Sequence, residues 1–116
     1  MNMTVGGAVV SATDYVKAHP GSVAMMGVCL SQAAQGCSRA QALAAPVRVS
    51  STYAQVDFPG VAQGRYTVRV VLLNSAGRTR LDATGTLHVV HHELSGCPST
   101  ANDSGSLKVQ PDGSFG

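Results

Sequence analysis

Residues 56–77 read VDFPGVAQGRYTVRVVLLNSAG, and this stretch decides the fold class of the chain. Between positions 65 and 70 apolar and polar residues alternate, which is the pattern of a β-strand with one face toward a core. Two glycines before this run and the Asn74–Gly77 segment after it are typical of turns. We therefore predict a β-hairpin in which one strand ends at Phe58, the glycine-rich segment reverses the chain, and a second strand runs to Asn74.

The composition of the chain extends this prediction to an all-β fold. The 116 residues include 16 valines, 20 serines and threonines and 13 glycines, a mixture that favours strands and turns over long helices. Shorter apolar or alternating runs predict the other strands, at residues 3–12, 22–30, 47–49, 54–58, 79–82 and 84–91.

Two segments have helical character. Thr13–His19 is compatible with one helical turn, a connector at most, with Thr13 as its N-cap and Asp14 near its positive end. Pro20 and Gly21 would end this turn. Between residues 31 and 45 the high alanine content predicts a short helix or an ordered loop.

These patterns predict a single domain. A chain of 116 residues and 11.8 kDa has room for one compact core. About seven short strands separated by turns are typical of an antiparallel β-sandwich of the immunoglobulin-like or prealbumin-like kind. We expect that fold over residues 1–116, with at most one short helix near residues 38–45. The polar, turn-rich segment from about residue 95 to 116 is expected to be a flexible or partner-contacting C-terminal arm.

The stretch from Val56 to Val70, closed by Asn74–Gly77, resembles a known segment of bacterial immunoglobulin-like and prealbumin-like modules, F-x-G-V/L-x-x-G-x-Y-x-V-x-V. Such modules recur in surface proteins, pilin subunits, carboxypeptidase-associated domains and phage virion proteins. The resemblance covers about 20 residues and implies the fold type, since one sandwich hosts adhesion, assembly and ligand binding alike. It also fits a core in which Phe58 and Tyr66 pack across the turn. The chain departs from the immunoglobulin pattern because it contains no tryptophan.

Charge and hydropathy argue against two classes of partner. The net charge is +2, and the one local concentration of basic residues is formed by four arginines. With five aromatic residues and no tryptophan, the chain lacks the basic, aromatic face of a nucleic-acid-binding protein. No apolar run approaches the roughly 20 residues of a membrane-spanning helix, and Met1–Val5 has no features of a secretion signal. We expect neither nucleic-acid binding nor membrane insertion, and no signal peptide in this chain.

The four arginines are candidates for an interaction face. Arg65 and Arg69 share one face of their strand, and Arg78 and Arg80 follow the next turn. Two interpretations stay open: a solvated face, or a stripe that meets acidic groups of a neighbouring subunit or ligand.

The three cysteines allow several redox states. Cys29 and Cys37 can close a small disulfide loop, which leaves Cys97 free or bonded to another subunit. Pairing of Cys97 with either of the others is equally compatible with the sequence, as are three reduced thiols. None of the cysteines lies in a C-x-x-C motif, so we expect no metal cage.

His88, His91, His92 and Glu93 form the one cluster of candidate ligands or acid-base groups. In a strand, His88 and His92 lie about 13 Å apart, too far to hold one ion, while His91 and His92 point to opposite faces. We therefore expect no metal site, no catalytic residues and no cofactor.

Three functions follow, in order of preference. The first is a non-enzymatic structural or interaction β-sandwich, a self-associating subunit or decoration protein of a larger surface assembly such as a phage virion. The second is a secreted or periplasmic ligand-binding module, for carbohydrate or adhesion, in which Tyr15, Tyr53 and Tyr66 are the available stacking residues. The third is a small enzyme that uses Cys97 with His91 or His92. For the first, we expect the chain on a virion, at a cell surface or outside the cell.

Overall fold

The computed structural model describes residues 7–93 and 101–116, with side chains described for residues 7–90 and 104–116. Within these residues, seven strands form one sheet and two short helices accompany them, so the prediction of an all-β domain is confirmed. The elements are β1 (Gly7–Ser11), α1 (Thr13–Ala18), β2 (Met25–Ser31), α2 (Arg39–Ala42), β3 (Val47–Arg48), β4 (Gln55–Pro59), β5 (Gly64–Leu73), β6 (Thr79–Glu93) and β7 (Ala101–Lys108).

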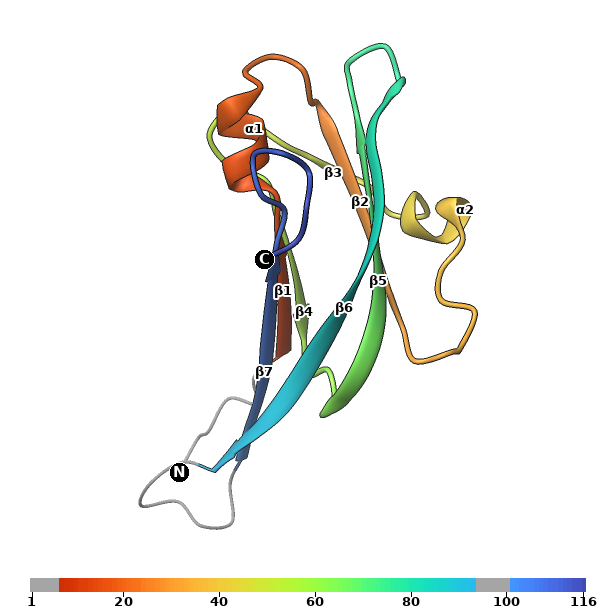
Figure 1. Ribbon diagram of the computed structural model, residues 1–116, viewed down its shortest axis with the longest axis vertical. Helices are drawn as coiled ribbons and strands as arrows, with labels where there is room; N and C mark the ends of the chain where they lie inside the picture. The colour runs from red at the N-terminus through yellow and green to blue at the C-terminus, as the bar shows by residue number, and fades with distance from the viewer. Residues whose placement is uncertain (1–6, 94–100) are drawn as a thin grey trace.

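The sheet folds over into two layers because β6 belongs to both of them. The strand order is β3-β2-β5-β6-β7-β1-β4. Residues 79–89 of β6 pair with β5, and residues 90–93 pair with β7. Figure 1 shows β6 crossing from β2 and β5 to the side of β1, β4 and β7. We call β3, β2, β5, residues 79–89 of β6 and the turn between β5 and β6 (residues 74–78) the β5 layer, and residues 90–93, β7, β1 and β4 the β1 layer. Neighbouring strands are antiparallel except β1 and β7, which run parallel.

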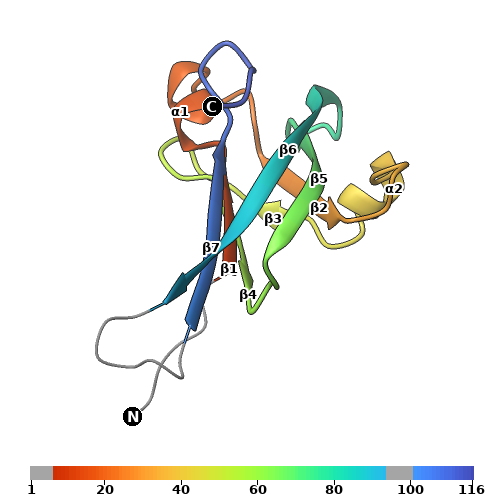
Figure 2. The same cartoon turned by 60° about the horizontal axis from the view of Figure 1, so that its bottom comes forward.

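A glycine allows β6 to cross β7 closely. A β-carbon on Gly105 would lie 2.7 Å from the carbonyl oxygen of His88 and 3.2 Å from Cα of Val89. Both atoms belong to the β6 backbone, so any side chain at this position would push the two strands apart. The absence of a side chain at Gly105 therefore brings the two layers together at this crossing, which is visible in Figure 2.

The core lies between the layers and follows the two-residue period of the strands. On β5, Val68, Val70 and Leu72 face inward and are fully buried. Val71 points to the outer side but is also buried, because α2 packs there against β2 and β5. The remaining fully buried side chains of large volume are those of Val10, Val16, Met26, Val89 and Val109.

The prediction of a hairpin between β4 and β5 is wrong. β4 pairs with β1 alone, whereas β5 pairs with β2 and β6, so the segment between them connects the two layers. The corner is closed by the hydroxyl of Tyr66, which donates a hydrogen bond to the Ala62 carbonyl at 2.7 Å, as tyrosines at such corners do in β-sandwiches. The following hairpin, between β5 and β6, does form at Asn74–Gly77. The strands expected at 79–82 and 84–91 are parts of the single strand β6.

Both segments with helical character form a short helix: α1 at the expected turn of residues 13–19, and α2 within residues 31–45. In α1, Thr13 is the first helical residue and not the N-cap. Its hydroxyl instead accepts a hydrogen bond from Ala54 N at 3.1 Å and donates one to Ala54 O at 3.2 Å. This tertiary contact outweighs the capping preference of threonine. α2 lies within the expected segment and has a capping box, in which Ser38 and Gln41 bond each other's backbone.

Residues 101–116 do not form the expected arm. β7 lies between β6 and β1, and Leu107 and Val109 are buried. The last residues fold back, because the backbones of Lys108 and Gly116 exchange two hydrogen bonds at 2.8 and 3.2 Å. They lie beside α1 in Figures 1 and 2. Residues 95–100 of the predicted arm lie outside the described part of the chain.

Candidate functional site

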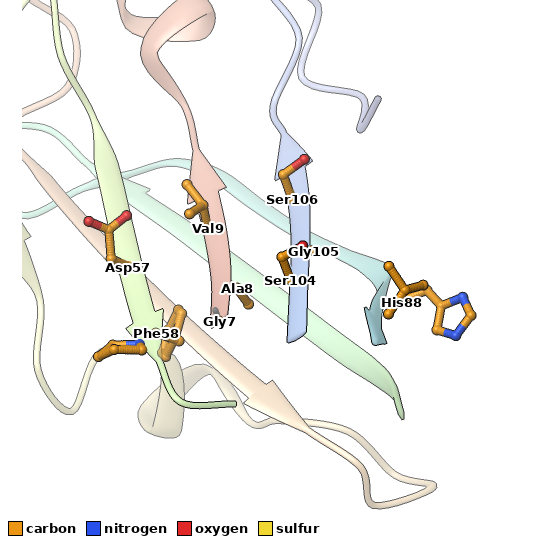
Figure 3. A pocket seen from close by; sticks show the side chains of 11 residues that line it. Gly7, Ala8, Val9, Asp57, Phe58, His88, Ser104, Gly105 and Ser106 are labelled. Atoms are coloured by element: carbon orange, nitrogen blue, oxygen red, sulfur yellow. The ribbon is translucent and has the colours of Figure 1, made fainter. Parts of the chain in front are cut away.

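The outer face of the β1 layer has a shallow, open hollow of about 770 Å³. The register places Asp57, Val9 and Ser106 in one row across β4, β1 and β7, as Figure 3 shows. Gly7 and Ser104 continue the lining, and these small side chains leave the backbone close to the surface. His88 borders the hollow from β6, with its ring directed away from β7 in Figure 3. The site offers a carboxylate and serine hydroxyls for hydrogen bonding.

A smaller hollow of about 360 Å³ continues this face toward α1 and shares Val9 and Ser106 with the first. Tyr53 lies at its border with 56% of its surface exposed, the most exposed large hydrophobic side chain in the described part of the chain. Asp14 and Lys108 add one charge of each sign. This hollow can stack one ring and bond several polar groups.

The predicted arginine face divides into two kinds of residue. Arg69 forms an ion pair with Asp82, with Nε and Nη2 each 2.8 Å from a different carboxylate oxygen. These hydrogen bonds lower the pKa of Asp82, and the nearby charge of Arg39 lowers it further. Arg69 also donates a 3.3 Å hydrogen bond to the Cys37 carbonyl. Arg69 therefore ties β5 to β6 and to the loop before α2.

The other three predicted residues, Arg65, Arg78 and Arg80, are exposed on the same layer. The fold adds two arginines that the sequence analysis did not group with them, Arg39 on α2 and Arg48 on β3. All six arginines of the chain therefore lie on the β5 layer or its helix.

This distribution separates charge between the β5 layer with α2 and the rest of the chain. Asp82 is the only acidic residue on the β5 layer and α2, so six arginines and one aspartate give a formal charge of +5 there. Because the whole chain carries +2, the rest of the chain carries −3. A low overall charge therefore hides a strongly basic face.

Cys29 and Cys37 form a disulfide with a Cα–Cα distance of 6.1 Å. It connects β2 to the loop that precedes α2, beside the Arg69 contact with Cys37. Cys97 lies outside the described residues. His91, His92 and Glu93 belong to the part of β6 that pairs with β7, where His91 is opposite Asp103.

Comparison with other proteins gives no relative. No protein-family model matches the chain, and no curated protein and no solved structure matches it either. In the described residues, no group of three histidine, cysteine, aspartate or glutamate side chains is placed to hold a metal ion. Neither α1 nor α2 is a helix that could span a membrane.

Proposed function

We propose that the chain is a non-enzymatic interaction domain, a subunit or decoration protein of a larger surface assembly such as a phage virion. The observation that carries this proposal is the location of all six arginines on the β5 layer and on α2, which packs against it. Interfaces with protein partners are enriched in arginine, and complementary charge selects and orients the partner. The proposed place of action is accordingly the surface of a virion or a cell.

The choice of arginine over lysine supports a protein partner. The β5 layer and α2 contain six arginines and no lysine, while both lysines of the chain lie elsewhere. A guanidinium group binds a carboxylate through two parallel hydrogen bonds and is less strongly hydrated than an ammonium group. An arginine-only face is therefore suited to carboxylates on a second protein surface.

The edges of the sheet favour contact through this face. β3, at one edge, has two residues and offers little backbone for strand addition. β4, at the other edge, has five residues, and a symmetric pairing with a second copy that uses all five places Asp57 opposite Asp57. Two like charges in direct opposition disfavour that edge-to-edge dimer.

The test is the mass of the native species by light scattering at about 50 mM and about 500 mM salt, with and without reductant. The proposal expects a species well above 11.8 kDa that shrinks at high salt, because screening weakens contacts between charged faces. Persistence of the large species in salt but collapse in reductant would instead assign assembly to an intermolecular disulfide, for which Cys97 is the candidate. The proposal would be contradicted if the chain were a monomer in all four conditions and were also absent from every larger assembly isolated from its source.

One observation favours the second candidate, a carbohydrate-binding module. Tyr15 is buried against His19, with ring centroids 4.2 Å apart, and the hydroxyl of Tyr66 is bonded to Ala62. Of the three tyrosines, Tyr53 alone keeps an exposed ring, and it borders a hollow whose lining includes hydroxyl, amide and charged side chains. This function predicts that a panel of monosaccharides raises the unfolding temperature of the wild type and not of Tyr53→Ala. The panel having no effect on the wild type would exclude it.

A further inference from the structure

A third hollow, of about 410 Å³, lies on the outer side of the β5 layer, beside the turn between β5 and β6. Met25 and Leu73 line it from β2 and β5, and both are half-buried. Arg48 borders it from β3. Two residues further along β2, Ala42 and Leu43 pack against Gly27. The end of α2 therefore covers the layer beside this hollow but not the hollow itself.

Strand register places the lining residues in one row. Arg48 is opposite Met25, Met25 is opposite Leu73, and Leu73 is opposite Thr79. Three steps between neighbouring strands make this row about 14 Å long. Its two central side chains are apolar, and a charged side chain occupies the β3 end.

A second arginine, Arg39, lies at the β6 end of the row. Nη2 of Arg39 donates a 2.8 Å hydrogen bond to the hydroxyl of Thr79, which places that guanidinium over the row. The row therefore has positive charge at both ends and an apolar middle.

Arg39 and Arg48 remain available for an outside partner. In the part of the chain with described side chains, the one ion pair is Arg69–Asp82. Both carboxylate oxygens of Asp82 are already bonded to Arg69. The row therefore meets no carboxylate at ion-pair distance within that part of the chain.

We infer that this row, which we call the arginine row (Arg48 and Arg39 at the two ends of Met25 and Leu73), binds an acidic, extended segment of a partner protein. In an extended peptide, side chains at positions i, i+2 and i+4 share one face, and positions i and i+4 are about 13 Å apart. Acidic residues at i and i+4 would reach the two ends of the row. An apolar residue at i+2 would cover Met25 and Leu73. The inference rests on the proposed function, because the segment belongs to a neighbouring subunit.

The apolar middle distinguishes this partner from a nucleic acid. A nucleic-acid backbone carries phosphates at every step, and some of them would lie over Met25 and Leu73 without a counter-charge. The exposed rings on which bases stack are also absent among the residues that line this hollow.

Binding of three capped pentapeptides to the full chain at low salt tests the inference. The probes are Glu-Ser-Leu-Ser-Glu, its glutamine version Gln-Ser-Leu-Ser-Gln, and Glu-Ser-Ser-Ser-Glu, with a short DNA duplex as a competing polyanion. We expect saturable binding of the first peptide and at least about fivefold weaker binding of the other two. The second peptide lacks the carboxylates that would bind the arginines, and the third lacks the leucine that would cover Met25 and Leu73. Equal binding of the two glutamate peptides, or tighter binding of DNA that depends on Arg48, would overturn the inference.

Matched arginine variants locate the site. Arg48→Gln and Arg39→Gln are each expected to weaken binding of the first peptide about fivefold, whereas Arg65→Gln should leave its binding unchanged. Arg65 is the control because it is exposed at the far end of β5, opposite His88. All three positions are on the surface, so each variant should fold, which its unfolding temperature checks. An equal loss with Arg65→Gln would show a general charge effect and overturn the inference.

The light-scattering test separates this inference from the function on which it rests. If the peptide does not bind while the salt-sensitive species persists in Arg48→Gln, the arginine row is wrong and the assembly function stands. If the peptide binds and the chain is a monomer absent from any particle, the row stands as a binding site and the assembly function fails.

Discussion

The ring of Phe115 lies against the bare Cα of Gly85, where a β-carbon would stand only 2.7 Å from Cδ2 of the ring. Gly85 is on the inward face of β6, between buried Leu87 and half-buried Leu81. The next-to-last residue of the described chain thus fills a place that a side chain of β6 would otherwise occupy. Aromatic rings often cover strand glycines in this way. The C-terminal residues are therefore part of the sandwich.

Replacing Phe115 by alanine is expected to lower the free energy of unfolding by about 2 kcal/mol, because half-buried aromatic surface is lost and Gly85 is uncovered. Gly85→Ala should also destabilise, by about 1–2 kcal/mol, since the new methyl group displaces the ring. In the double variant the methyl group has room, so the two losses should not add. Urea unfolding of the four proteins measures this. Additive losses would show that the two residues do not interact.

The crossing of β6 over β7 gives a second prediction. A β-carbon on Gly105 meets backbone atoms of His88 and Val89, which cannot move aside as a side chain can. We expect Gly105→Ala to cost about 2 kcal/mol of unfolding free energy, whereas Ser106→Ala, at the exposed neighbouring position, should change it by less than about 0.5 kcal/mol. The measurement is urea unfolding of both variants. Similar small effects at both positions would argue against the tight crossing.

The alternation in the sequence predicted where strands form better than which strands pair. The pattern around Val68 is local, and it correctly places β5 and the turn at Asn74–Gly77. The segment before Tyr66 has the glycines of a hairpin, but whether two strands pair or face each other across a core depends on long-range packing. β7 was missed for a different reason. Its serines and glycines obscure a two-residue alternation in which only Leu107, continued by Val109, is strongly apolar.

The candidate site could be predicted only in part. Four arginines are close in sequence, but Arg39 and Arg48 join them through α2 and β3, whose positions depend on the tertiary fold. The pairing of Arg69 with Asp82 could have been predicted from the sequence. Once the Asn74–Gly77 hairpin is assumed, its register makes these residues diagonal neighbours on one face. The hollows result from small side chains on neighbouring strands, which no local pattern indicates.

The disulfide yields a prediction for both stability and thiol chemistry. Cys29 and Cys37 are eight positions apart, and the chain-entropy model gives about 2.5 kcal/mol for closing such a loop. We expect Cys29→Ser with Cys37→Ser to lower the unfolding free energy by about that amount. Thiol titration of the wild-type protein in denaturant should find one free thiol per chain before reduction and three after reduction. Three thiols before reduction would contradict the disulfide, and none together with a doubled mass would place Cys97 in an intermolecular bond.

The ion pair between Arg69 and Asp82 predicts a pH dependence of stability. The hydrogen bonds from Arg69 lower the pKa of Asp82 below its ordinary value of 3.8, so the folded protein binds its proton less readily than the unfolded chain. The stabilisation is therefore fully present above pH 3.8 and is lost as the pH falls through the lowered folded-state pKa. The unfolding temperature of Asp82→Asn should lie below that of the wild type at neutral pH, and the difference should vanish in acid.

The comparison requires one control, because a second carboxylate titrates in the same direction. The hydroxyl and backbone N–H of Ser114 bond Asp112 at 2.6 and 3.0 Å and lower its pKa as well. Both proteins should therefore carry Asp112→Asn, so that the remaining difference reports Asp82. The pair is about one-quarter exposed, with side-chain exposures of 25% and 27%, so added salt should also reduce the difference. A difference that stays constant from neutral pH to about pH 2 would mean that Asp82 stabilises the fold by packing and not by charge.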